Sequence, residues 1–228
     1  MESTLHPTQI AILEEALANF GEHGYEGTSF KTIADAIGRP PSLVVYHFAT
    51  KENLYLETFK YLFEIYPFRA VPPIHLEDLP TSERHAAAFA CLEGQVRQLA
   101  REVLPDAACQ DSRRNLGAKL WMRELQFPRP VLHDLIHLQL AAFVSSIREC
   151  MRILHPEKPA AEVDFLGAAL VGNIVGHTTM FGLNQIIWGG EYSRLPRSRM
   201  IELILDACLR GFVTPAGAGG GLTEHGWS

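Results

Sequence analysis

Residues 28–54 constrain the fold of this 228-residue chain more than any other segment. Thr28 or Ser29 can cap a short helix, because a hydroxyl oxygen accepts a hydrogen bond from a first-turn N–H. Gly38 can adopt the left-handed conformation that ends such a helix. Pro40-Pro41 can begin the next one, since a missing N–H costs nothing at the first helical position. The pattern predicts a helix-turn-helix, whose second helix, about two turns long, enters the DNA major groove.

The residues in and around this segment resemble the tetracycline-repressor (TetR) family. Residues 44–54 are similar to its Tyr-x-His-Phe-x-x-Lys-Glu-x-Leu pattern, and the similarity extends back through residues 33–38 to residues 10–20 and 24–28. It covers about the first quarter of the chain. The resemblance implies a homodimeric, all-helical regulator, usually a repressor. Its larger C-terminal domain would bind a small molecule and so release the operator.

Three positions depart from the family pattern. Arg39 and Pro40 stand where the family usually has a small aliphatic residue followed by Ser. Val45 stands where the family usually has a second aromatic residue. All three change what faces the bases, so the target sequence cannot be carried over from a relative.

The rest of the chain carries apolar residues at helical spacing and no useful β-alternation. We therefore predict an all-α fold, with an N-terminal three-helix helix-turn-helix DNA-binding domain and a larger helical ligand-binding and dimerisation domain. The predicted boundaries are 1–50 for the DNA-binding domain, 51–66 for a connecting helix, 67–214 for the effector-binding and dimerisation domain, and 215–228 for a disordered Gly-rich tail.

Between Asp164 and Glu191 the chain has no charged side chain, a length sufficient to span a bilayer. The same stretch contains several Asn, Thr and Gln residues, and polar groups at that density are costly in hydrocarbon. We predict one helix over residues 159–188 that is buried on most sides in a soluble protein. A membrane span is the alternative.

The charge of the chain opposes tight binding to random DNA, which depends on neutralising phosphates. The formal net charge is −6, and the first 60 residues hold four basic against eight acidic side chains. We expect DNA binding to depend on the local placement of Lys31, Arg39 and Lys51 and on helix N-termini, whose N–H groups favour anions. An acidic helical module that binds no nucleic acid is the alternative.

The cysteines are widely separated and include no C-x-x-C pair, which favours buried thiols in a reducing cytoplasm over a disulfide framework or a zinc site. The N-terminus has neither a basic nor an apolar signal region, so we expect a cytoplasmic protein. We predict no cofactor and no membrane partner. The expected partners are a double-stranded DNA operator, a small-molecule effector of unknown identity and a second copy of the chain. The four cysteines are Cys91, Cys109, Cys150 and Cys208.

The predicted DNA contacts fall into two groups. Small side chains at the start of the second helix suit thymine methyls and one hydroxyl contact. The resemblance places Tyr46, His47 and Lys51 at positions that hold the DNA backbone, although Tyr46 and His47 could equally be structural. The predicted DNA-binding residues are Thr28, Ser29, Lys31, Arg39, Pro41, Ser42, Leu43, Val45, Tyr46, His47 and Lys51.

Residues 121–130 form the densest cluster of aromatic, charged and proline residues, and they resemble a subset of TetR-type regulators with Arg-Glu followed by Pro in the ligand-binding domain. His133 and His137 have the i, i+4 spacing of metal ligands, but no third ligand lies nearby in sequence, so we predict no metal. His177 could donate into a pocket or be a core histidine. The predicted effector-binding residues are Trp121, Arg123, Glu124, Phe127, His133, His137, Asn173, His177 and Phe181.

The last two long helices each carry apolar residues on more than one face, and such a helix must bury both. One face would pack inside the domain and the other against a second copy, with a larger monomer core as the alternative. The predicted dimer interface comprises Leu166, Leu170, Ile174, Met200, Ile204 and Cys208.

An enzyme is the main rival class, because Glu124, His133 and His177 could in principle act as acid and base. No nucleophile elbow, phosphate loop or paired-carboxylate motif accompanies them, so we predict no enzymatic activity. The sequence predicts a ligand-responsive transcriptional regulator, more often a repressor than an activator. It would bind a palindromic operator as a homodimer and be released by its effector. An activator and a ligand-independent regulator stay open.

Overall fold

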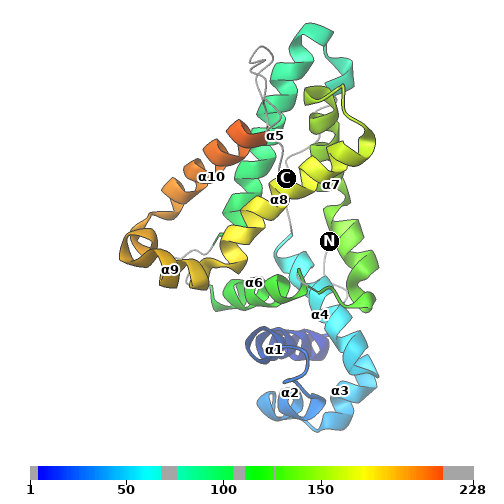
Figure 1. Cartoon of the computed structure of the whole chain (residues 1–228). Helices are drawn as coiled ribbons and strands as arrows, with labels where there is room; N and C mark the ends of the chain where they lie inside the picture. Colours follow the sequence, from blue (N-terminus) through cyan, green and yellow to red (C-terminus); the bar gives the residue numbers. More distant parts are fainter. Residues whose placement is uncertain (1–4, 68–75, 105–110, 126, 213–228) are drawn as a thin grey trace, which may run out of the picture. The chain divides into compact units, whose positions relative to one another are not determined.

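The computed structural model describes residues 5–67, 76–104, 111–125 and 127–212 (Figure 1). Within these ranges all regular structure is helical, which confirms the predicted all-α fold. The helices are α1 (Pro7–His23), α2 (Phe30–Ala36), α3 (Pro41–Phe48), α4 (Lys51–Ile65), the 3-10 helix η1 (Leu76–Asp78), α5 (Thr81–Val103), α6 (Ser112–Glu124), the 3-10 helix η2 (Pro130–Leu132), α7 (His133–Leu154), α8 (Ala160–Thr179), α9 (Phe181–Arg194) and α10 (Arg197–Phe212).

Contacts divide the described residues into two compact units. The first unit consists of residues 5–67, 111–125 and 127–143, and the second of residues 76–104 and 144–212. Helix α6 and the start of α7 therefore pack with the N-terminal helices. The predicted boundaries at residues 50 and 66 divide the chain by role and stay a prediction, and the predicted tail lies outside the described residues.

The ends of the short helices follow the predicted capping signals. Ser29, rather than Thr28, caps α2 with its hydroxyl. Gly38 follows with a φ of 64°, the left-handed conformation expected of it. Pro41 occupies the first position of α3, and Thr50 caps α4. Local residue chemistry is thus sufficient to set the limits of the helix-turn-helix.

The first unit is built around α1, which packs against α4 and α6, while α2 packs against α3. Two glycines allow α6 to approach closely. A Cβ at Gly21 would lie 2.8 Å from the backbone oxygen of Leu116, and one at Gly117 would lie 2.4 Å from Leu62 Cδ1. The fully buried side chains include Ile12, Leu13, Leu17, Phe20, Ile33, Val44, Leu54, Tyr55, Phe59, Leu120 and Leu132.

In the second unit, α5 packs against α8 and α10, which also contact each other. Its core contains a small polar group, in which Gln95 donates to Ser146 Oγ at 2.8 Å. Burial raises the pKa of the Cys208 thiol to about 11. Three of the four predicted buried thiols are confirmed as buried, and Cys109 lies outside the described residues. The three are Cys91, Cys150 and Cys208.

The predicted single helix over residues 159–188 is wrong in two respects. The chain breaks at Met180, where α8 and α9 meet at a bend of 70°. Helix α9 is also largely exposed, with Ile186 81% and Trp188 70% accessible. An uncharged run reveals apolar character but neither where a helix breaks nor which side is covered.

Two described segments are apolar and long enough to be tested as membrane spans. Residues 130–154 have the length and apolar composition of a membrane-spanning helix, and these two criteria alone select them. The α8–α9 pair meets the same two criteria only if the two helices are counted as one bent span.

Candidate DNA-binding surface and its support

Helix α3 buries one face and presents the other. Val44 and Phe48 are buried in the core of the first unit. Ser42 is exposed, Val45 is 46% accessible and Tyr46 is 80% accessible. Within the first unit, the described residues therefore leave uncovered the face that would enter a groove.

The remaining residues predicted to contact bases or backbone near α3 are also accessible to different degrees. Pro41 is exposed at the start of the helix, and Leu43 is partly buried. His47 is partly buried, with its ring centroid 5.1 Å from that of Tyr46. This placement leaves both the structural and the DNA-binding interpretation of His47 open.

The three cations predicted to meet DNA have different surroundings. Lys31 on α2 and Arg39 in the turn before α3 are exposed. Lys51, at the start of α4, is half-buried, and its Nζ lies 4.4 Å from the centroid of the Tyr25 ring. Lys51 is therefore held by the first unit, whereas Lys31 and Arg39 extend into solvent.

Thr28 does not lie at the surface where a phosphate contact was predicted. Its side chain is buried, and Oγ1 donates to the carbonyl oxygen of Gly24 at 2.9 Å. Thr28 fixes the connection between α1 and α2, and we correct its assignment accordingly. Ser29 is exposed, and its Oγ accepts from the Thr32 N–H at 3.1 Å.

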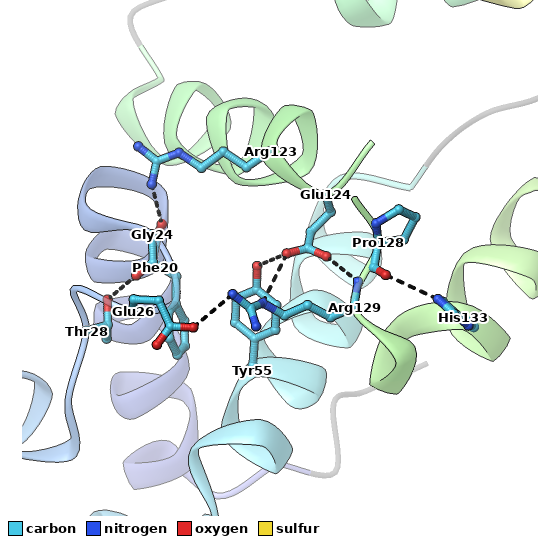
Figure 2. A network of polar contacts seen from close by, with 10 residues as sticks. All are labelled: Phe20, Gly24, Glu26, Thr28, Tyr55, Arg123, Glu124, Pro128, Arg129 and His133. Carbon is cyan, nitrogen blue, oxygen red and sulfur yellow. Dashed lines mark hydrogen bonds and ion pairs between the residues drawn. The ribbon is translucent and has the colours of Figure 1, made fainter. Parts of the chain in front are cut away.

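Glu124 forms the centre of a buried polar network next to this surface (Figure 2). Its Oε1 accepts from Tyr55 Oη at 2.6 Å, and its Oε2 accepts from the Arg129 backbone N–H at 2.9 Å. The Arg129 Nε lies 3.6 Å from Oε1. Burial, followed by the bond to Glu124, raises the pKa of Tyr55 well above its usual value, so Tyr55 remains a donor at neutral pH.

The Arg129 guanidinium links this carboxylate to the connection between α1 and α2. Its Cζ lies 3.9 Å from the Tyr25 ring centroid, and Nη2 lies 3.2 Å from Glu26 Oε1. Tyr25 in turn packs edge-on against Tyr55, with ring centroids 4.9 Å apart. Burial raises the pKa of Tyr25, with Glu52 as the next contributor. Residues from α6, the loop before η2, α4 and the α1–α2 connection thus form one cluster.

Two other predicted effector ligands also hold α6 in place. The ring centroid of Trp121 lies 5.3 Å from that of Phe63 on α4. Arg123 donates to the carbonyl oxygens of Phe20 and Glu22, at 3.4 and 3.1 Å, at the C-terminal end of α1. Trp121, Arg123 and Glu124 therefore hold α6 within the first unit, and their role in effector binding stays a prediction. Sequence proximity could not reveal which helices they join.

The other predicted effector residues in the first unit face solvent. Phe127 is 84% accessible. His133 and His137 are exposed, and His133 Nε2 lies 3.2 Å from the carbonyl oxygen of Pro128. No group of three or more His, Cys, Asp or Glu side chains suited to a metal ion occurs among the described residues.

The last three predicted effector residues belong to the second unit. Asn173 is exposed, and its Oδ1 accepts from Cys208 Sγ at 3.5 Å. Phe181 packs against Tyr192, with ring centroids 5.9 Å apart, and His177 is half-buried. The nine candidates are thus divided between the two units.

The predicted dimer residues also need correction, because four of them are core residues of a single chain. Leu170, Ile174, Ile204 and Cys208 are each at most 4% accessible within the second unit. Leu166 and Met200 are half-buried. The sequence showed apolar stripes on two faces but not which one points inward. The exposed apolar or small residues of α8 and α10 include Phe165, Ala168, Gly172, Leu203 and Ala207.

Arg129, Tyr25 and Tyr55 were not predicted as site residues. The signal available in the sequence is the Pro128-Arg129-Pro130 run, because two prolines restrict the backbone around one cation. Its partners lie about 70 and 100 residues earlier in the chain. No local pattern connects residues that far apart.

An exposed two-turn helix on a compact helical core defines a helix-turn-helix protein. Residues 12–58 match the family model described as bacterial regulatory proteins, tetR family. The HTH-type transcriptional repressor AcnR of Corynebacterium diphtheriae is 28% identical over 153 residues, covering 60% of this chain and 78% of AcnR. The resemblance recognised in the sequence is confirmed by this match, which covers the N-terminal part of the chain.

Solved structures share the fold at low sequence identity. FadR of Bacillus subtilis, in complex with stearoyl-CoA, has a TM-score of 0.56 and 17% identity, covering 89% of this chain and 98% of FadR. NalD of Pseudomonas aeruginosa, the secondary repressor of the MexAB-OprM multidrug efflux pump, has a TM-score of 0.55 and 19% identity, covering 91% of this chain and 97% of NalD. At such low sequence identities, the structural similarity supports a shared fold and nothing more.

Proposed function

We propose that this chain is a cytoplasmic repressor that binds a palindromic operator as a homodimer and is released by a small-molecule effector. The observation that carries the proposal is the uncovered face of α3, mounted on a well-packed core. The match of residues 12–58 to the TetR family model and the similarity to the repressor AcnR support it. An activator would use the same surface, and only the place of the operator relative to the promoter separates the two.

The accessible side chains of α3 suit two kinds of DNA contact. Ser42 can hydrogen-bond a base edge, and Leu43 and Val45 can contact thymine methyls. Tyr46 and Lys51 would hold phosphates, and such contacts fix register without specifying sequence. Because the first 60 residues carry more acidic than basic side chains, binding should be weak wherever α3 does not match its site.

We propose that the second copy binds over the exposed faces of α8 and α10, which contact each other in the second unit. The exposed apolar residues follow helical spacing on both helices, with Phe165, Ala168 and Gly172 on α8 and Leu203 and Ala207 on α10. A Cβ at Gly172 would meet nothing within 4 Å. Glycine inside a helix lowers helix stability by about 1 kcal/mol relative to alanine. A partner helix that approaches closely would explain why glycine stands at position 172.

The effector proposal rests on the second unit. Asn173, His177 and Phe181 are the candidate contacts that belong to the second unit, whereas the other six predicted effector residues belong to the first. The B. subtilis FadR structure contains stearoyl-CoA, which shows that this fold accommodates an apolar ligand with a polar group. We propose a ligand of mixed apolar and polar character for this chain as well.

A selection experiment tests the proposal. Purified full-length chain is incubated with a library of random DNA duplexes, and bound duplexes are recovered and sequenced over several rounds. We expect enrichment of an inverted repeat whose half-sites are centred about one helical turn apart. Recovery of random sequence, or of a single asymmetric site, would contradict the proposed dimeric repressor.

A further inference from the structure

We propose that Arg129 is a positioning residue for DNA binding, although it lies far outside the helix-turn-helix in sequence. Its guanidinium fixes the Tyr25 ring, against which Lys51 also lies. The inference rests on the proposed function of Lys51 as a phosphate contact. Arg129 would act through Tyr25 and Lys51 without touching DNA.

The geometry behind this inference is the sharing of one aromatic ring by two cations. Arg129 Cζ lies 3.9 Å and Lys51 Nζ lies 4.4 Å from the Tyr25 ring centroid. A cation within about 6 Å of a ring centroid is attracted by the ring quadrupole. Both interactions restrict the same ring, so the position of one cation affects the position of the other.

Arg129 is itself rigidly held. Its backbone N–H donates to Glu124 Oε2 at 2.9 Å, and its Nε lies 3.6 Å from Glu124 Oε1 (Figure 2). Pro128 and Pro130 restrict the backbone on either side. Glu124 is buried and has Tyr55 Oη as a further partner, so the carboxylate cannot turn to solvent without leaving these donors unpaired. The guanidinium is therefore a fixed support for the Tyr25 ring.

The charges add a second effect. Arg129 and Lys51 lie within one Debye length of each other, about 10 Å at 0.1 M salt. Like charges repel, so the fixed guanidinium favours orientations of the Lys51 ammonium that point away from it. Glu26 offsets the charge of Arg129 only weakly, because its side chain is 82% accessible and an exposed ion pair is screened by solvent.

A double-mutant cycle on DNA binding tests the proposal. Affinity for the selected operator is measured by fluorescence anisotropy for the parent, Arg129→Gln, Lys51→Ala and the double variant. We expect Arg129→Gln to weaken binding about five- to tenfold in the parent and less than about twofold in the Lys51→Ala background, since coupled residues are non-additive. Equal losses in both backgrounds, or no loss in the parent, would overturn the proposal.

Two further variants separate positioning from mere stabilisation. Lys119→Ala removes another link between α6 and α1, the exposed pair with Glu22, without touching Tyr25, so we expect its affinity for the operator to be unchanged. Arg129→Lys keeps the charge but loses the planar contact, and we expect an intermediate loss of affinity with unchanged helical content. If Arg129→Gln does not fold, Arg129→Lys is carried through the same cycle, and additive losses there would also overturn the proposal.

The two proposals fail in distinguishable ways. A parent chain that selects and binds no operator contradicts the proposed function, and the role of Arg129 falls with it. A parent chain that binds while the cycle is additive leaves the proposed function intact and removes the positioning role alone.

Discussion

At the scale of single residues, the two ends of α3 differ in what they can contact. Ser42 and Leu43 lie near the N-terminal end and have short side chains suited to base edges, whereas Tyr46 lies near the other end with 80% of its surface accessible. Lys51 follows at the start of α4, half-buried over Tyr25. The separation predicts that affinity and sequence preference can be changed independently.

We expect Lys51→Ala and Tyr46→Ala to weaken operator binding without changing sequence preference, because phosphate contacts carry affinity rather than base identity. Lys51→Ala should also reduce the salt dependence of log K by about one unit of slope. Ser42→Ala serves as the contrast, and it should change the preferred base at one position of each half-site. Gel-shift titrations on a panel of single-base operator variants measure both effects. Parent-like affinity in Lys51→Ala would remove it from the DNA contacts.

Glu124 is the residue whose removal should cost the first unit most stability. Glu124→Leu leaves Tyr55 Oη and the Arg129 N–H without an acceptor, which should lower the free energy of unfolding by about 2–4 kcal/mol. Tyr55→Phe removes one donor and leaves the carboxylate its Arg129 partners, so about 1 kcal/mol is expected. Urea denaturation followed by circular dichroism measures both. A Glu124→Leu variant as stable as the parent would show that the network does not stabilise the unit.

Residue chemistry predicted the caps well and the side-chain roles less well. The limits of α2 and α3 follow from Ser29, Gly38 and Pro41 because capping depends on neighbours one to four residues away. Thr28 was misplaced because a hydroxyl can bond inward or outward with equal chemical ease. The sequence does not state which side of Thr28 faces the core.

At the scale of helices, α6 is the element whose packing partners the sequence did not reveal. Its pattern predicted a helix of the C-terminal domain, whereas the structure packs it against α1 and α4 through two glycines. Periodicity reveals that a helix has an apolar face but not which partner covers it. The same limit explains why the packing of Trp121, Arg123 and Glu124 within the first unit was not predicted.

The two glycines should respond differently to a single added methyl group. At Gly21 the new Cβ would meet the backbone oxygen of Leu116 at 2.8 Å, which cannot move without shifting α6. At Gly117 it would meet the Cδ1 atom of Leu62, which can change rotamer. We expect Gly21→Ala to lower the free energy of unfolding by about 1–3 kcal/mol and Gly117→Ala by less, measured by urea denaturation. The reverse order would contradict this account of the α1–α6 contact.

At the scale of the whole molecule, the proposed pairing of two chains determines whether both half-sites can be bound. We expect Leu203→Glu to yield monomers, because a buried unpaired carboxylate opposes association. Multi-angle light scattering measures the mass, and operator binding should fall with it. Leu138→Glu is the matched control, an equally drastic change at a residue 72% accessible in the first unit. Dimers of Leu203→Glu would exclude the proposed α8–α10 surface.

The whole-molecule architecture could be predicted only in outline. The all-α class followed from helical periodicity, and the resemblance to the TetR family followed from residues within the matched range 12–58. The break at Met180 and the exposure of α9 could not be predicted, because an uncharged apolar run has no feature that marks a bend. An apolar run also does not mark which face of a helix points inward. Ile174 and Ile204, which were predicted at the dimer interface, are therefore found in the core of one chain.

The most direct test of the central claim, that α3 enters the DNA groove once per half-site, is affinity cleavage. A Ser42→Cys variant carries an iron chelate on the new thiol, and the parent chain, whose described thiols are buried, serves as the labelling control. We predict strand scission at two symmetric positions of the selected operator, about one helical turn apart. Scission at one position, or scattered cuts equal to those of the control, would contradict the claim.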